Sequence, residues 1–411
     1  MSLRISLLMK VLVVLMVFLS GCSSSLFSSP TETATIPPPT STSIPPTPTF
    51  TPTPTEVPFY VDAIVWTGEL QVPILIYHRF VSDDTEDAAT TKTHFSEFRA
   101  HLQKLYDNGF SLISLESWLS GNFVVPAGRK PLIITMDDLW SADQLYINDD
   151  GTPSQYSGIG ILWKFSQEHP DFGFSVSGFS NMGDKLFADT FRPWDERYIR
   201  NSDDNSPIWR DKLSNTMVWA LENGVRPFNH TYTHAKLDIT APTDIQYQLA
   251  ENDRVTRFFL ARVEREDLIP QLGNIIALPY GIWPSTQSGI NVMKNYENPE
   301  GLPVTAILEA YNLDAAQLTP SVFSKNFDRF KIQRITTSDS MIQFIVDKKD
   351  DIPSSVGCQV GPILKDLSMD LDALSAAISE MIQKGNCPEG IYNINGNVFI
   401  AKNGTVILYT P

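Results

Sequence analysis

Two of the six histidines in this chain, His230 and His234, are four positions apart in the stretch NHTYTHAKLD, and no other pair of histidines has this spacing. Both follow the short run 225–228, VRPF, so we expect them at the end of a strand. Two imidazoles and one carboxylate form a common zinc-type site that leaves one position open for water. A metal site of this kind would therefore need a carboxylate from elsewhere in the chain.

A pair of aspartates can supply that carboxylate. Of the five Asp-Asp pairs in the sequence, only Asp137-Asp138 directly ends an apolar strand, PLIITMDD, and the other four stand in polar surroundings typical of solvated loops. Two carboxylates at one strand end repel each other unless a cation offsets their charge. An aspartate pair and a histidine pair, each after a strand, together predict a divalent metal site.

The surrounding segments alternate between strand and helix patterns. We expect a helix that starts with Thr93 as its N-cap and stops at Gly109, and a second helix that ends at Gly224. Strands alternating with helices predict a parallel α/β body, either an open sheet or a barrel, with reactive residues at the C-terminal ends of the strands. Apolar runs predict these strands at 72–78, 111–115, 131–135, 173–179 and 274–281.

The end of the chain has a different pattern. The segment 369–385 reads as an amphipathic helix, and Asn395-Gly396 and Asn403-Gly404 are strong hairpin signals. We therefore expect a small α+β appendage over residues 346–411, to which the sequence assigns no chemistry. A disulfide between Cys358 and Cys387 is expected in an oxidising compartment, and two free thiols are the alternative.

The N-terminus predicts export and anchoring. Residues 1–22 combine a basic start, the apolar run 11–19 and small residues, as in a secretory signal that is short for a membrane span. The sequence LSGC ending at Cys22 resembles the bacterial lipobox, in which the cysteine is lipidated; an ordinary signal peptide is the alternative. Residues 23–59 are mostly a Pro/Thr-rich linker. We expect a protein of the cell envelope, lipid-anchored on the extracytoplasmic side of a bacterial membrane.

The whole-chain composition excludes one class of partner. The 411 residues carry a net charge of -16 with a pI near 4.8, and 42% of them are hydrophobic. The hydrophobic content is sufficient for a buried core. The negative net charge disfavours nucleic-acid binding, because the chain has no basic surface to neutralise phosphates.

The motifs VPILIYH, ITMDD, NHTYTHAKLD and ALPYG, in this order, resemble the polysaccharide deacetylases of carbohydrate esterase family 4 over about residues 70–285. The resemblance implies a distorted (β/α) barrel over residues 60–345 and a divalent metal, usually zinc. It also implies the removal of acetyl groups by hydrolysis. In the N-acetylated sugars of peptidoglycan, chitin or biofilm glycans, the bond that breaks is a carbon–nitrogen bond. Some members of the family deacetylate O-acetylated xylan instead.

The resemblance also implies roles for individual residues. Asp138, His230 and His234 would be the metal ligands, and Asp137 would be the general base that takes a proton from the attacking water. The backbone N–H of Tyr280 would donate to the tetrahedral oxyanion.

The sequence departs from the family pattern in three places. Leu139 follows the aspartates where the family has glycine, so this loop must take a different path. Ala277 stands where the family has an arginine, and Arg334 is a candidate substitute. No histidine follows His234, so the family's late histidine acid is missing. His78 is our candidate for that acid, with a structural role in the barrel as the alternative.

The segment between Asp138 and His230 has two possible roles for its aromatic side chains. It is rich in aromatic residues, among them Trp194 and Trp209, which either stack on sugar rings or pack the insert down. The departures also motivate a second function, a lipid-anchored glycan-binding protein that keeps the metal site and has lost turnover. A serine esterase is excluded because the chain has no Gly-x-Ser-x-Gly elbow.

Overall fold

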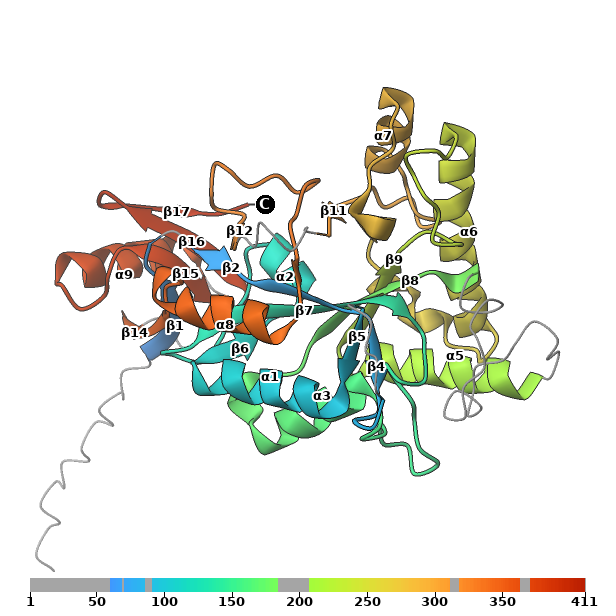
Figure 1. Ribbon diagram of the computed structural model, residues 1–411. Helices are drawn as coiled ribbons and strands as arrows, with labels where there is room; N and C mark the ends of the chain where they lie inside the picture. The colour runs from blue at the N-terminus through green and yellow to red at the C-terminus, as the bar shows by residue number, and fades with distance from the viewer. Residues whose placement is uncertain are drawn as a thin grey trace, which may run out of the picture. The chain divides into compact units, whose positions relative to one another are not determined.

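The computed structural model (Figure 1) describes residues 60–68, 70–85, 91–183, 207–310, 318–362 and 370–410. The signal segment with Cys22, the linker up to residue 59, Trp194 and the side chain of Trp209 lie outside the described residues. Within the part of the chain that is described, no helix is both long enough and apolar enough to span a membrane.

A parallel sheet lies at the centre of the fold. Its strands are buried along most of their length, as the continuous apolar runs predict. The first half of β7 pairs with β6 (Phe110–Leu112), and its second half pairs with β3. The strand order is β11 (Ala306–Leu308), β10 (Ile275–Ala277), β9 (Val225–Asn229), β8 (Val176–Ser180), β7 (Lys130–Leu139), β3 (Ile74–Tyr77) and β13 (Ile335–Thr336).

The two edges of this sheet are joined. Leu308 at the end of β11 forms an isolated parallel bridge with Ile332, and the chain then runs directly into β13. In β13, Ile335 pairs with Leu75 of β3. The segment 332–336 thus connects β11 to β3 and closes the sheet irregularly. The prediction of an α/β fold with a distorted barrel is confirmed.

Helices cover the outside of the sheet, and Figure 1 shows α1 and α3 running beside each other. The apolar side chains of α1, among them Phe98, Leu102 and Leu105, are fully buried in the main core. The longer helices of this part of the fold include α1 (Phe95–Asp107), α3 (Gly158–Glu168), α5 (Pro207–Glu222), α6 (Pro242–Ala261) and α8 (Asp339–Asp347).

The start of α1 corrects one prediction. The N-cap is His94 and not Thr93, because Thr93 pairs with Phe80 between the short strands β5 (Lys92–His94) and β4 (Arg79–Val81). The carboxylate of Glu97 accepts a hydrogen bond from the backbone N–H of His94 at 3.3 Å, as in a capping box. The end of the helix agrees with the prediction, since Gly109 has a φ of 82°.

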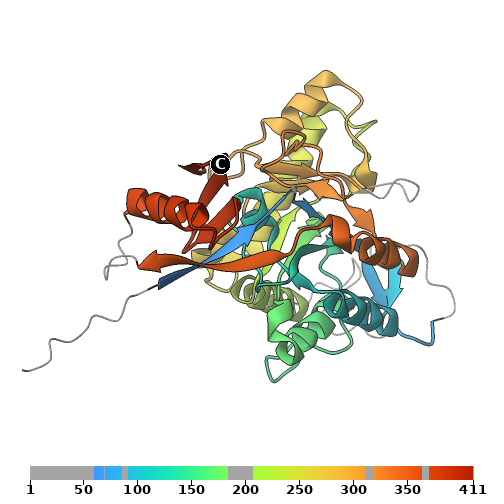
Figure 2. The ribbon, with the colours of Figure 1, turned by 90° about the vertical axis from the view of Figure 1, so that its left-hand side faces the viewer.

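The C-terminal region forms a separate antiparallel sheet with α9 (Leu371–Gln383) packed against it (Figure 2). Both Asn-Gly pairs have positive φ, from 44° to 84°, and connect β15 to β16 and β16 to β17 as predicted. The predicted disulfide Cys358–Cys387 is present, with a Cα–Cα distance of 5.9 Å. The strands are, in sheet order, β14 (Ser355–Pro362), β1 (Tyr60–Trp66), β15 (Gly390–Ile394), β16 (Asn397–Lys402) and β17 (Thr405–Leu408).

One strand of this sheet comes from the other end of the described chain. β1, which the predicted boundaries place in the barrel, pairs antiparallel with both β14 and β15. Figure 2 shows the blue β1 beside the orange-red β14. The appendage sheet therefore needs residues from before the barrel to complete its hydrogen bonding.

Candidate metal centre

The residues singled out by sequence follow the C-terminal ends of neighbouring strands. His78 directly follows β3, His230 directly follows β9, and Tyr280 lies just beyond β10. Asp137 and Asp138 lie within the last residues of β7, where the pairing with β8 is irregular between Met136 and Leu139. An irregularity of this kind redirects side chains at a strand end. The parallel sheet thus brings all of these groups to the side of the sheet where its strands end.

Asp138, His230 and His234 converge on one point. Each offers a ligand atom, and these atoms all lie within 4.8 Å of one another. Oδ1 of Asp138 is 3.7 Å from Nε2 of His234 and 4.0 Å from Nε2 of His230. His230 is fully buried, whereas the side chains of His234 and Asp138 are about one-fifth exposed, at 20% and 23%. The group is closed on one side and open to solvent on the other, as in metal sites that keep a position for water.

The hydrogen bonding of His230 fixes its tautomer. Nδ1 lies 2.9 Å from the backbone carbonyl oxygen of Ala277, which can only accept, so Nδ1 carries the proton and donates. Nε2 is then an unprotonated lone pair that faces Oδ2 of Asp137 at 3.7 Å and Oδ1 of Asp138 at 4.0 Å. Burial lowers the pKa of His230, and the nearby aspartates only partly offset this effect. A lone pair facing two carboxylates is repulsive, and a divalent cation among them would reverse the sign.

A second group with metal-ligand chemistry, Glu97, His101 and Asp339, has a different explanation. Nε2–H of His101 donates to Oδ1 of Asp339 at 3.0 Å, and Nδ1 accepts from the hydroxyl of Tyr77 at 3.2 Å. Every ring nitrogen is satisfied in this chain of hydrogen bonds, so no cation is required. The contrast singles out the site at the strand ends.

Backbone strain is concentrated at the same place. Four residues there have left-handed backbone conformations: φ is 58° at Asp138, 62° at Thr231, 52° at His234 and 57° at Tyr280. Non-glycine residues rarely adopt this conformation, and such positions cluster at functional sites. Asp138 takes this conformation directly before Leu139, in the irregular last part of β7.

The buried Asp137 is paired with Arg334. Nη1 and Nη2 of Arg334 donate to Oδ1 and Oδ2 of Asp137 at 2.6 and 2.9 Å, in a bidentate ion pair. Burial raises the pKa of Asp137, but the Arg334 guanidinium lowers it by more, and the result is well below the usual range. Asp137 is therefore ionised at neutral pH. Arg334, the candidate substitute for the missing arginine, thus contacts Asp137 directly.

Tyr280 lies beside the site, with its ring against that of His234. Its ring centroid is 4.4 Å from that of His234, and the residue is 56% exposed. Among the hydrogen bonds of the described residues, none uses the N–H of Tyr280 as a donor. This N–H is available to an oxygen atom of a ligand.

His78 lies close enough to Asp137 for a charge on its ring to lower the pKa of that carboxyl. Its backbone carbonyl accepts a hydrogen bond from Nε2 of Gln144 at 2.7 Å. The same Nε2 donates to the backbone carbonyl of Asp137, also at 2.7 Å. Gln144, which is fully buried, therefore ties the end of β3 to the end of β7 and holds the candidate acid near the candidate base.

Two residues of the site, Gln144 and Asn181, are absent from the sequence predictions. Nδ2 of Asn181 donates to Oδ1 of Asp138 at 2.8 Å. Asn181 directly follows β8, so the rule that directed attention to strand ends would have found it. No local signal distinguishes Gln144, because its role depends on two backbone carbonyls from different strands.

No family model matches the sequence, and no curated protein matches it. Several solved structures are similar in fold. The Streptococcus pyogenes deacetylase PplD in complex with acetate is 15% identical, with a TM-score of 0.40 over 65% of this chain and 92% of that one.

Two further structures give the same picture. The putative polysaccharide deacetylase BA0330 from Bacillus anthracis is 15% identical, with a TM-score of 0.42 over 68% of this chain and 69% of that one. IcaB from Ammonifex degensii is 13% identical, with a TM-score of 0.40 over 69% and 97%. Likeness of this extent assigns no role to any residue of this chain.

Proposed function

We propose that this protein is a metal-dependent deacetylase, a hydrolase of carbon–nitrogen bonds other than peptide bonds. Its substrates would be the N-acetyl groups of GlcNAc-type sugars in a cell-envelope or extracellular polysaccharide. One observation carries the proposal: the three ligand atoms of Asp138, His230 and His234 converge beside the ionised, buried carboxylate of Asp137. Two imidazoles and one carboxylate fit zinc, which we propose as the metal.

The residues divide the chemistry among them. A cation held by Asp138, His230 and His234 would polarise the acetyl carbonyl and lower the pKa of a water molecule beside it. Asp137 accepts a proton from that water as its oxygen attacks the carbonyl carbon. The backbone N–H of Tyr280 donates to the oxygen that becomes negative.

The second half of the reaction needs an acid. When the C–N bond breaks, the amine nitrogen takes a proton, and acetate and a free amino sugar leave. We propose that the imidazole of His78 donates this proton, because it follows β3 beside Asp137 and no histidine occurs after His234. Gln144 holds the backbone of His78 and Asp137 at a fixed separation, which such a division of roles requires.

The alternative of a binding protein without turnover loses one of its motives. It rested in part on the missing family arginine, and the bidentate contact of Arg334 with Asp137 supports Arg334 as the substitute. A pure binder would also gain nothing from holding a buried carboxylate ionised. We therefore favour the enzyme.

We further propose that the protein is exported and anchored by a lipid on Cys22, with residues 23–59 as a stalk. The sequence LSGC and the Pro/Thr composition support this placement. Fractionation of cells that express the wild type and Cys22→Ser tests it. The wild type should sediment with membranes and the variant should not; equal sedimentation of both would contradict the anchor.

The activity is tested by acetate release from N-acetylated chito-oligosaccharides and from acetylated xylan, with and without EDTA. We expect release from the chito-oligosaccharides that EDTA abolishes and zinc restores. The matched control is Asp137→Ala. If wild type and Asp137→Ala release equally little acetate from every substrate while both bind metal, the enzyme assignment is wrong.

A further inference from the structure

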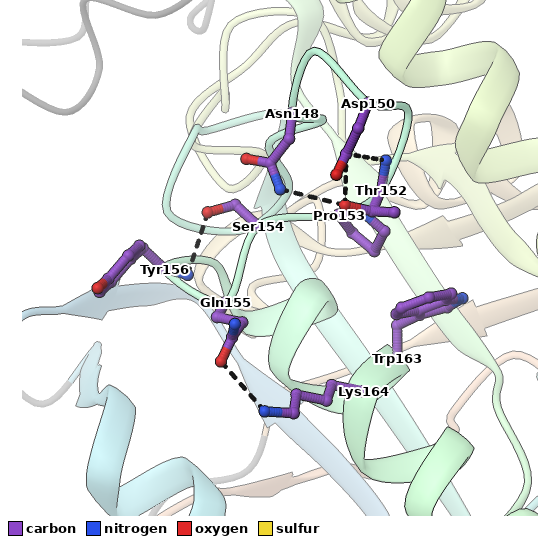
Figure 3. A pocket seen from close by; sticks show the side chains of 9 residues that line it. All are labelled: Asn148, Asp150, Thr152, Pro153, Ser154, Gln155, Tyr156, Trp163 and Lys164. Atoms are coloured by element: carbon purple, nitrogen blue, oxygen red, sulfur yellow. Dashed lines mark hydrogen bonds between the residues drawn. The ribbon is translucent and has the colours of Figure 1, made fainter.

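We propose that a depression between the loop 147–157 and α3 binds sugar residues of the polysaccharide away from the one that is deacetylated. The class of ligand rests on the proposed function. The cavity has a volume of about 450 Å³ and does not include the metal centre. Figure 3 shows the residues that line it: Asn148, Asp150, Thr152, Pro153, Ser154, Gln155, Tyr156, Trp163 and Lys164.

The lining has the chemistry of a carbohydrate site. Tyr156, which is 67% exposed, and Trp163 lie on opposite sides of the group of lining residues in Figure 3, and their flat apolar rings suit the C–H faces of a sugar. Between them, amides and hydroxyls provide both donors and acceptors for sugar hydroxyls. The only charged side chains of the lining are Asp150 and Lys164, of opposite sign, so the lining is neutral in sum and favours an uncharged ligand over an ionic one.

The loop that forms one wall is held by its own hydrogen bonds. The backbone N–H of Asn148 donates to the carbonyl oxygen of Thr152 at 2.8 Å, and Gly151 takes a φ of 81° to make the turn. The carboxylate of Asp150 accepts from the backbone N–H and the hydroxyl of Thr152, at 2.9 and 2.6 Å. A wall that is ordered before binding costs less conformational entropy when a sugar binds.

The same loop is locked onto α3. A Cβ atom at Gly160 would lie 1.9 Å from the backbone oxygen of Ser154, so the helix and the loop touch without room to slide. The hydroxyl of Ser157 donates to that same oxygen at 2.7 Å. Only glycine allows this close approach of the helix to the loop.

The depression is also tied to the metal centre through the chain. Gln144, whose side chain holds the backbone of His78 and Asp137, accepts a hydrogen bond at its own carbonyl from the N–H of Ile159 at 2.8 Å. The first turn of α3 is therefore fastened to the segment that leaves the catalytic strand end. A polysaccharide that engages both places gains affinity from the second contact, because that contact is intramolecular.

A second, smaller depression of about 220 Å³ continues from the first and shares Gln155 and Lys164 with it. Two adjoining depressions suit a ligand with repeating units better than a single small molecule. The remaining residues of the second depression are Arg99, Gln103, Ile161, Phe165 and Glu168.

The test compares a long and a short saccharide. Binding of the GlcNAc hexamer and the GlcNAc dimer is measured by titration calorimetry in an Asp137→Asn background, which prevents turnover. Trp163→Ala and Tyr156→Ala should each weaken binding of the hexamer by about 2- to 12-fold, the range expected for losing one aromatic contact. Binding of the dimer should not change. The matched control is Phe258→Ala, an aromatic residue on α6 that is 47% exposed and lines neither depression.

The outcomes separate this proposal from the proposed function. If the hexamer binds the two folded variants as tightly as the parent, or does not bind the parent, the sugar site is wrong even where wild type releases acetate. If hexamer binding depends on Trp163 but wild type releases no acetate from any substrate, the site stands and the enzyme assignment falls. Thermal unfolding of each variant confirms that it is folded, and Tyr156→Ala is the safer variant because that side chain is exposed.

Discussion

The ion pair between Arg334 and Asp137 gives the sharpest test of the site. Arg334→Met removes the guanidinium and keeps an unbranched side chain of similar reach. Asp137 is then left buried, at 3% exposure, without the two hydrogen bonds of 2.6 and 2.9 Å that hold its charge. Breaking one partner of a buried pair costs about 3–5 kcal/mol. We expect a loss of this size in the free energy of unfolding at pH 7, measured by urea denaturation in EDTA.

The ion pair also predicts how the stability difference between wild type and Arg334→Met changes with pH. In the wild type the pKa of Asp137 lies below that of an unfolded aspartate, about 3.9. The pair therefore stabilises the fold fully above that value, and its contribution is lost as the pH falls through the lower, folded-state pKa. In Arg334→Met, burial acts with less opposition and raises the pKa of Asp137, so lowering the pH relieves the penalty. The stability difference between wild type and variant should shrink from pH 7 to pH 4.

The matched control is the isosteric change Asp137→Asn, alone and combined with Arg334→Met. Because the two residues are in direct contact, the double variant should be less destabilised than the sum of the single variants by 1 kcal/mol or more, roughly the coupling of a buried pair. A loss below about 1 kcal/mol at pH 7 for Arg334→Met would refute the reasoning, given the value of a typical buried pair. A difference that stays constant with pH would refute it as well.

Three further predictions concern the ligands, the base and the disulfide. His230→Ala should abolish stoichiometric zinc binding, measured by metal analysis after dialysis. His101→Ala, in the group of His101 with Glu97 and Asp339, should leave the zinc content unchanged. Equal zinc loss in both variants would contradict the assignment. Asp137→Asn should keep the metal and lower the rate of acetate release by about 10²–10⁴-fold, and a smaller drop would remove Asp137 as the base. Cys358→Ser should lower the free energy of unfolding by about 3–4 kcal/mol, because the disulfide closes a loop with a separation of 29 residues. Acetate release at 25 °C should stay unchanged. An unchanged unfolding curve would show that the disulfide adds no stability.

Short-range patterns in the sequence determined a large part of this protein. The apolar runs predicted the parallel strands, and the rule about strand ends singled out Asp137, Asp138 and His230 from their positions in the chain alone. The Asn-Gly turns and the Gly109 stop were also right, because the left-handed conformation is a local property of those residues. In each case the physical cause lies within a few residues of the feature.

Only the tertiary structure decided the rest. Arg334 reaches Asp137 across 197 positions, and Ala277 fixes the tautomer of His230 across 47, so neither contact has a signature in local spacing. Thr93 was displaced from the N-cap because a neighbouring strand pairs with it, and β1 joined a sheet whose other strands begin at residue 355. Sequence spacing predicts which residues end a strand. Which ends meet, and which proton and charge each group then carries, is set by strand register and burial.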